Sequence, residues 1–175
     1  MKKEDLKTKI LFEISKDEFP DLEFLFSKES LELFLEILKE LLQERKENFK
    51  KLIKIPLEKI QFEDFEDFDK LSHLFLLLQH INMVDKSDIS QKTIETFEPI
   101  YTDFLNKIQF SKEYYERVCF VLEKRNLDEE QRRILELEKK SFELNWINLP
   151  KETQKEINKI NIILSKLYLK FQDNI

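Results

Sequence analysis

Apolar residues recur at steps of three and four positions along most of the chain, and this spacing places them on one face of an α-helix. The clearest run consists of Leu31, Phe34, Leu35, Leu38, Leu41, Leu42, Phe49, Leu52 and Ile53. Pro56 follows this run, and the residue before a proline is disfavoured in the α conformation. The sequence therefore predicts a long amphipathic helix that ends before Pro56.

Five further segments carry the same periodicity, which predicts an all-α fold: a multi-helix bundle of about six mostly antiparallel helices. The second helix is expected from Phe62 through Leu78 to Met83, with acidic residues favouring its N-terminus. The remaining four are expected to begin near Ser87, Ser111, Asp128 and Pro150. No repeat and no low-complexity linker divides the chain, so a single domain is expected over residues 1–175.

Two of these helix starts have the spacing of a capping box, in which two side chains three residues apart satisfy backbone N–H groups. They are Asp88 with Gln91, where Ser87 is another possible N-cap, and Asp128 with Gln131. The helix after the second box is expected to use the apolar residues Ile134, Leu137, Phe142 and Leu144.

Two regions are less regular. Pro99 lies inside the third helix, and because apolar periodicity continues beyond it, the proline is expected to kink this helix rather than end it. Near the N-terminus, Ile10–Ile14 fits either a short helix or a strand, and Phe19–Pro20 marks a turn.

Composition excludes several classes of protein. A net charge of −6 argues against a nucleic-acid partner, which would need clustered Lys and Arg. The longest apolar runs, such as Leu74–Leu78, are too short to span a membrane. The start, Met1–Asp5, turns acidic before an apolar signal core could form, and Cys119 is the single cysteine. These features predict a cytoplasmic protein with no internal disulfide and no nucleic-acid or membrane partner.

The chain contains no glycine and no alanine, and it has sixteen phenylalanines. A strongly AT-rich genome would suppress the GC-coded residues Gly, Ala, Pro and Arg together. Redesign with a reduced alphabet would do the same, and would make the chain a scaffold without a function. Inherited-looking residues such as Met83 and Cys119, and the irregular Pro99, favour genomic bias.

The two histidines, His73 and His80, do not form a catalytic zinc motif. Neither is followed by glutamate, whereas an H-E-x-x-H site needs two imidazoles one turn apart with a carboxylate between them. They lie seven residues apart, where a bridged metal would need a further ligand from elsewhere. The favoured interpretation is that His80 and Asn82 form a polar helix end that satisfies backbone groups.

Three other groups have both a functional and a structural interpretation. The carboxylates within Glu63–Asp69 could form an acid–base pair, but their alternation with phenylalanines is typical of a solvated helix face. Trp146, Phe142 and Tyr168 could stack on a ligand, but aromatic side chains at helical spacing more often pack in a core. Cys119 is expected to be a small core residue. No catalytic, cofactor-binding or metal-binding residue is therefore assigned.

One set of motifs, in a fixed order, resembles the N-terminal helical region of zinc oligopeptidases of the thimet oligopeptidase and oligopeptidase A family. The matching residues are Ser72-His73-Leu74, His80–Val84, Phe97, Pro99, Tyr101, Phe142-Glu143-Leu144, Leu149–Glu152, Gln154, Leu164-Ser165 and Phe171–Ile175. The resemblance is firm from about Leu71 onward and looser before that position.

The resemblance implies a non-catalytic N-terminal fragment of a cytosolic zinc oligopeptidase that degrades short peptides, with the helices forming part of a peptide-channel wall. Zinc would belong to the full-length family, and the missing catalytic lobe would be the natural partner. This chain carries no counterpart of the zinc ligands, so it should be inactive alone. The alternative is a stand-alone helical protein-interaction module derived from the same fold.

The chain departs from the family in the turn before Leu149, where the family usually carries glycines. Here Trp146 and Asn148 occupy those places. Asparagine tolerates a left-handed backbone, so Asn148 is a plausible substitute, whereas Trp146 would be strained there.

The last helix is expected to expose an apolar face, because the segments that normally cover it in the family are missing. A weak homodimer is therefore expected, involving Ile163, Leu167 or Phe171.

Overall fold

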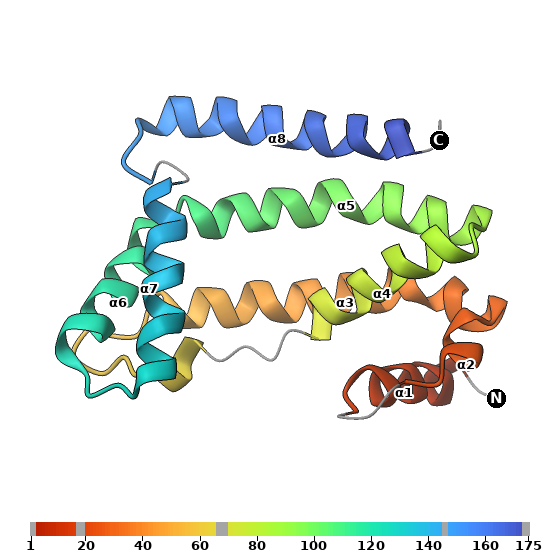
Figure 1. Ribbon diagram of the computed structural model, residues 1–175, viewed down its shortest axis with the longest axis horizontal. Helices are drawn as coiled ribbons and strands as arrows, with labels where there is room; N and C mark the ends of the chain where they lie inside the picture. Colours follow the sequence, from red (N-terminus) through yellow and green to blue (C-terminus); the bar gives the residue numbers. More distant parts are fainter. Residues whose placement is uncertain (1–2, 17–19, 66–69, 145–146, 173–175) are drawn as a thin grey trace. The chain divides into compact units, whose positions relative to one another are not determined.

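The computed structural model describes residues 3–16, 20–65, 70–144 and 147–172, and every regular element within them is helical (Figure 1). The elements are α1 (Lys3–Ile14), α2 (Leu22–Phe26), α3 (Lys28–Leu52), the 3-10 helix η1 (Phe62–Phe65), α4 (Lys70–Val84), α5 (Asp88–Gln109), α6 (Lys112–Lys124), α7 (Glu129–Leu144) and α8 (Lys151–Gln172). The all-α class is confirmed, although these ranges hold eight α-helices rather than about six. None of the described helices combines the length and the apolar character that crossing a membrane requires.

The two additional helices lie in the N-terminal region whose pattern was ambiguous. Ile10–Ile14 belongs to α1, and α2 is only 5 residues long. The side chain of Asp21 caps α2 by accepting a hydrogen bond of 3.0 Å from the backbone N–H of Phe24. Phe19 lies outside the described residues. A helix this short leaves no periodic pattern to detect, so its capping residue was the available sequence signal.

The expected helix from Phe62 to Met83 was wrong at its start, although α4 does extend through Met83 to Val84. Phe62 and Phe65 bound the short η1, and the α-helix begins only at Lys70. The Asp64 carboxylate accepts a hydrogen bond of 2.8 Å from the Gln61 N–H, which fixes the start of η1 as a separate turn. Met83 is 77% exposed, so it does not extend the apolar face of α4.

Side-chain caps set the starts of α5, α6 and α7. Ser87 and Ser90 exchange backbone-to-hydroxyl hydrogen bonds of 3.1 Å, so this pair, and not Asp88 with Gln91, forms the box at α5. Ser111 caps α6. At α7 the predicted Asp128–Gln131 box is confirmed, since the Gln131 N–H donates to Asp128 at 2.8 Å and the Asp128 N–H donates to Gln131 at 3.2 Å.

The prolines act as expected at helix boundaries. The long helix α3 ends at Leu52, before Pro56. Helix α5 continues through Pro99, which confirms that this residue does not end the helix, while the kink stays a prediction. Pro150 directly precedes α8, and its carbonyl accepts the hydrogen bond of the Gln154 N–H.

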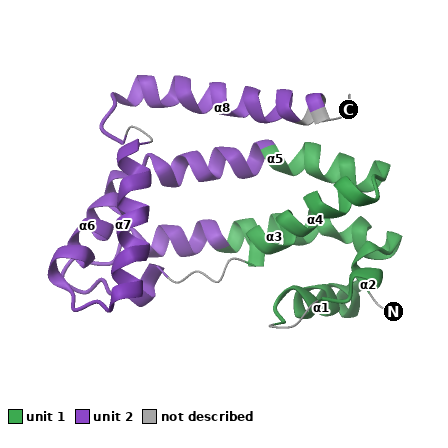
Figure 2. Ribbon diagram, viewed as in Figure 1, with its two compact units in different colours: residues 1–44, 68–98 green, residues 45–67, 99–175 purple. Residues whose placement is uncertain are grey.

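The chain forms two compact units, and α3 and α5 contribute to both (Figure 2). Unit 1 comprises residues 1–44 and 68–98, and unit 2 comprises residues 45–67 and 99–175. In unit 1, α1 packs against α4, and the rings of Phe75 and Phe97 meet edge to face at 5.1 Å. The fully buried side chains there include Ile10, Leu25, Phe34, Ile37, Leu38, Leu74, Leu78 and Phe97.

In unit 2, α6 and α7 pack side by side over a core that reaches the segment before η1. This core contains Ile60, Phe62, Val118, Val121 and Leu135. The predicted apolar face of α7 was partly wrong. Phe142 is buried, but Ile134, Leu137 and Leu144 are about half exposed or more, and Leu135 is buried in their place.

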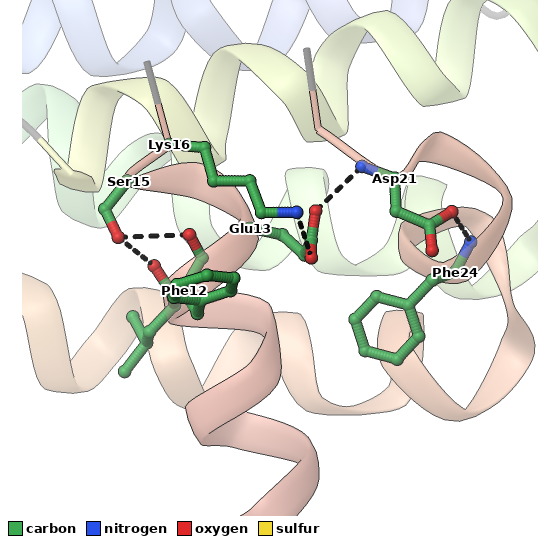
Figure 3. A network of polar contacts seen from close by, with 7 residues as sticks. Phe12, Glu13, Ser15, Lys16, Asp21 and Phe24 are labelled. Carbon is green, nitrogen blue, oxygen red and sulfur yellow. Dashed lines mark hydrogen bonds and ion pairs between the residues drawn. The ribbon is translucent and has the colours of Figure 1, made fainter. Parts of the chain in front are cut away.

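A buried carboxylate joins α1 to the start of α2 in unit 1 (Figure 3). Glu13 is only 4% exposed, and its two oxygens accept hydrogen bonds from the Lys16 ammonium at 2.6 Å and the Asp21 N–H at 2.8 Å. The hydrogen bond from Lys16 and then that from Asp21 lower the pKa of Glu13, against the opposing effect of burial. The ionised form of Glu13 is therefore the one that the fold stabilises.

Two arginines on α6 hold the segment that follows α3. The guanidinium of Arg117, a buried residue, donates to the carbonyls of Leu52 at 3.0 Å, Ile55 at 2.7 Å and Glu113 at 2.8 Å. Arg125 donates to the carbonyl of Ile60 at 2.8 Å and also to that of Glu58. Arg125 is itself the C-cap of α6, with an extended backbone at φ −108° and ψ 150°. Four of these bonds, those to Leu52, Ile55, Glu58 and Ile60, tie the end of α3 and the segment after it to α6.

Replacing Arg117 with Lys should lower the free energy of unfolding by about 2–3 kcal/mol, because one ammonium cannot reach three carbonyls in the planar geometry of a guanidinium. Urea titration followed by circular dichroism would measure this, with Arg132→Lys on the exposed face of α7 as the control. Equal midpoints for the two variants would contradict the role assigned to Arg117.

The Glu13→Gln variant should be less stable than the parent chain at neutral pH, and the difference should shrink as the pH falls. A carboxyl group whose pKa is lower in the folded state stabilises the fold above its unfolded pKa, here near the ordinary 4.5, and loses that effect as the pH drops through the folded value. Melting temperatures measured from pH 7 to below 4.5 would test this. The exposed Glu23→Gln serves as control, and a constant difference across the range would refute the linkage.

Candidate functional site

The two histidines are exposed on α4, and the structure does not bring a metal site to either of them. Within residues 3–16, 20–65, 70–144 and 147–172, no three His, Cys, Asp or Glu side chains group closely enough to hold a metal ion. The side-chain oxygen of Asn82 accepts a hydrogen bond of 2.7 Å from the Ser90 hydroxyl, so this bond joins two side chains, whereas the prediction for His80 and Asn82 concerned backbone groups. Asn82 thereby links the end of α4 to the cap of α5.

The described part of the acidic segment Glu63–Asp69 is a solvated face, as the sequence predicted. Glu63 and Asp64 are exposed while Phe62 is buried, and residues 66–69 lie outside the described residues. The carboxylate of Asp64 accepts a hydrogen bond from the backbone N–H of Gln61 and not from a second carboxyl group. An acid–base pair is therefore not supported by these two residues.

Cys119 is half-buried on α6, whereas the sequence predicted a core residue. Burial, then a hydrogen bond with Cys119 and another with the Glu143 carboxylate, raise the pKa of Tyr115 above its ordinary value. The Tyr115 hydroxyl donates to Glu143 at 3.0 Å. Nucleophilic cysteines sit beside cationic groups, whereas this neighbour is a phenol that keeps its proton.

The aromatic residues that were suggested as a ligand site do not lie together in one pocket where the structure describes them. Phe142 is fully buried, with its ring 5.4 Å from that of Tyr114 and 5.8 Å from that of Tyr115. Tyr168 is 60% exposed on α8, and Trp146 lies outside the described residues. Phe142 is thus a core residue, as the structural interpretation expected.

The strongest candidate for a functional surface is the outward face of α8. Six apolar side chains on this helix are each more than half exposed, and they recur at helical spacing. We call them the α8 row: Ile160, Ile163, Leu164, Leu167, Tyr168 and Phe171. Isolated exposed apolar residues are ordinary, whereas a row of them along one helix is a candidate interaction surface.

The opposite face of α8 is held in unit 2 by a ladder of side-chain amides. The Asn158 amide donates to Asp103 at 3.0 Å, the Asn106 amide donates to Asn158 at 2.7 Å, and the Asn161 amide donates to Asn106 at 3.1 Å. Burial opposes the ionisation of Asp103, yet hydrogen bonds from Lys107 and Asn158 keep its pKa below the ordinary value. These directional bonds fix the rotation of α8 about its axis, and so they fix which face carries the α8 row.

In the described part of α8, the charged side chains that lie beside the α8 row are positive. Lys159 and Lys166 are exposed and lie seven residues apart, on one side of the row. The acidic Glu152 and Glu156 precede the row. A second copy that pairs through the same row would bring like charges together, which weakens such a dimer.

Comparison with known proteins identifies one family. Residues 28–154 match the family model described as Neurolysin/Thimet oligopeptidase, N-terminal domain. No curated protein and no solved structure matches the chain significantly. The matched segment runs from the first residue of α3 to Gln154 in the first turn of α8, so it covers all but α1, α2 and most of α8.

The two faces of α8 should respond differently to substitution. Asn158→Ala should lower the free energy of unfolding by about 1 kcal/mol, because it removes the hydrogen bonds that Asn158 makes to Asp103 and Asn106. Leu164→Glu on the outward face should change it by less than about 0.5 kcal/mol. Chemical denaturation of both variants at low protein concentration would measure this, and a large loss for Leu164→Glu would show that the row is packed within its own chain.

Proposed function

The chain belongs to the Neurolysin/Thimet oligopeptidase N-terminal domain family, and on that basis we propose that it is the non-catalytic N-terminal part of a cytosolic zinc oligopeptidase. In this proposal its helices form part of the wall of a channel that receives short peptides. A separate catalytic lobe of the same protein carries out their hydrolysis. The family match over residues 28–154 is the observation that carries the proposal.

The donor groups of the described residues do not fit a catalytic zinc ion. Such an ion takes three protein ligands, commonly two imidazoles one helical turn apart and a carboxylate. Here the imidazoles of His73 and His80 are two turns apart, and no third ligand groups with them in the described ranges. The proposal therefore assigns zinc and its chemistry to the catalytic lobe, and derives no reaction step from this chain.

The α8 row supports a role as a structural partner of such a lobe. Its six side chains remain exposed while the opposite face of the helix is bound in unit 2, so the row is available for a contact outside the described chain. Burial of apolar surface contributes about 25 cal/mol per Å², which makes this row the main source of free energy for such a contact.

The same exposed row also favours a second candidate, a stand-alone helical interaction module that keeps the family fold and binds another protein. The two candidates differ in where the partner is encoded. The test is to read and express the complete open reading frame that encodes this chain. A frame that continues into an H-E-x-x-H segment, with zinc and peptide hydrolysis in the product, is the expected result. A frame that stops at Ile175 would overturn the proposal in favour of the module.

The 175-residue chain alone should neither bind zinc stoichiometrically nor hydrolyse short peptides, because it lacks the paired imidazoles and the general base. Elemental analysis and a fluorogenic peptide assay, each with and without a chelator, would check this. Zinc that is lost together with hydrolysis on chelation would contradict the prediction.

The isolated chain should associate weakly with itself through the α8 row, with Lys159 and Lys166 limiting the affinity. Analytical ultracentrifugation over a range of protein concentrations should show an average mass that rises with concentration, and Leu167→Glu should abolish the rise. The control is Leu137→Glu, at an exposed apolar position on α7. A clean monomer at high concentration, or equal effects of the two variants, would refute association through α8.

A further inference from the structure

Unit 2 contains a cavity of about 290 Å³ away from the α8 row. It opens among the C-terminal part of α3, η1, the end of α5, the first turn of α6, and α7. Its lining consists of Arg45, Asn48, Phe49, Leu52, Asp64, Phe65, Leu105, Ile108, Gln109, Tyr114 and Glu138. The volume lies at the lower end of the range for pockets that enclose small organic molecules. All described lining residues belong to the same compact unit, so the cavity does not depend on how the two units are placed.

Three aromatic rings form one wall of this cavity. The Phe49 ring stacks near the Tyr114 ring, with centroids 5.9 Å apart and an interplanar angle of 29°. The Phe65 ring meets Tyr114 edge to face at 5.5 Å. Tyr114 in turn stacks on the buried Phe142 at 5.4 Å, which anchors the wall to the core. These rings are half-buried, and their faces carry the negative quadrupole that attracts cations.

The charged side chains that line the cavity also favour a cationic ligand. The lining contains two carboxylates, Asp64 and Glu138, and one guanidinium, that of Arg45, so the charged side chains in it sum to one negative charge. Burial raises the pKa of Glu138, and the nearby charge of Arg45 opposes that effect. The Asp64 carboxylate is fixed by its bond to the Gln61 N–H, and a carboxylate retains further acceptor sites.

We propose that this cavity binds a small arylalkylammonium cation. The ammonium group would lie between the carboxylates of Asp64 and Glu138, and the aromatic body would lie against Phe49 and Tyr114. An anion would meet two carboxylates and one guanidinium, and a neutral ligand would leave the half-buried carboxylate of Glu138 without a charged partner from the ligand. The inference does not rest on the proposed function, because it is drawn from the residues that line the cavity and not from the family match.

The test uses three probes of similar shape and different charge: phenethylamine, 2-phenylethanol and 3-phenylpropionate. Each is titrated into the isotope-labelled 175-residue chain, and amide chemical shifts are followed by NMR. Phenethylamine should bind with a Kd on the order of 1 mM, as expected for a ligand of this size, and should shift amides around Phe49, Asp64, Tyr114 and Glu138. The alcohol should bind roughly tenfold more weakly, and the carboxylate more weakly still.

Paired variants assign the charge preference to the cavity. Glu138→Gln keeps the size of the side chain and should weaken phenethylamine about tenfold while leaving 2-phenylethanol unchanged. Glu136→Gln, at an exposed position of the same helix outside the lining, should change neither probe. Equal binding of the three probes, shifts confined to other parts of the chain, or equal effects of the two variants would overturn the proposal. Absence of shifts from phenethylamine at ten times the expected Kd would overturn it as well.

Discussion

The arrangement of unit 2 depends on the hydrogen bonds that Arg117 donates to three backbone carbonyls. Helix α3 ends at Leu52, and the chain must cross to η1 through a segment with no regular structure of its own. Arg117 binds the carbonyls of Leu52 and Ile55, and Arg125 binds two more farther along. The two arginines thereby bind the connecting segment to α6, and Ile60 and Phe62 from the same stretch lie in the core.

Much of the fold follows from apolar periodicity and capping, and the errors have identifiable causes. The all-α class, the end of α3, the Asp128–Gln131 box and the start of α8 were predictable from local pattern. The separation of η1 from α4 was not, because the phenylalanines continue at helical spacing through this part of the sequence. The face of α7 was misjudged because Leu135 is buried by the segment around Ile60, a contact between residues distant in sequence.

Functional surfaces were predictable only where a single helix carries them. Ile163, Leu167 and Phe171 were singled out because the family resemblance implied that the last helix lacks its usual covering segments, and the structure exposes all three. The unit 2 cavity had no such signal, because Arg45, Asp64 and Glu138 come from three elements and none stands out in its own segment. The family resemblance, by contrast, came from motifs spread along the chain, and the match over residues 28–154 confirms it.

The extended backbone at the ends of α2 and α6 has a consequence for the unfolded chain. Ser27 has φ −60° and ψ 147°, and Arg125 is similarly extended, so these helices end without a left-handed residue. A chain with no glycine lacks the residue that samples the widest range of backbone angles when unfolded. The unfolded chain therefore samples fewer backbone conformations than a chain that contains glycine, and folding loses less backbone entropy per residue. Glycine in place of Arg125 would broaden the unfolded ensemble and would also remove the hydrogen bonds to the carbonyls of Ile60 and Glu58.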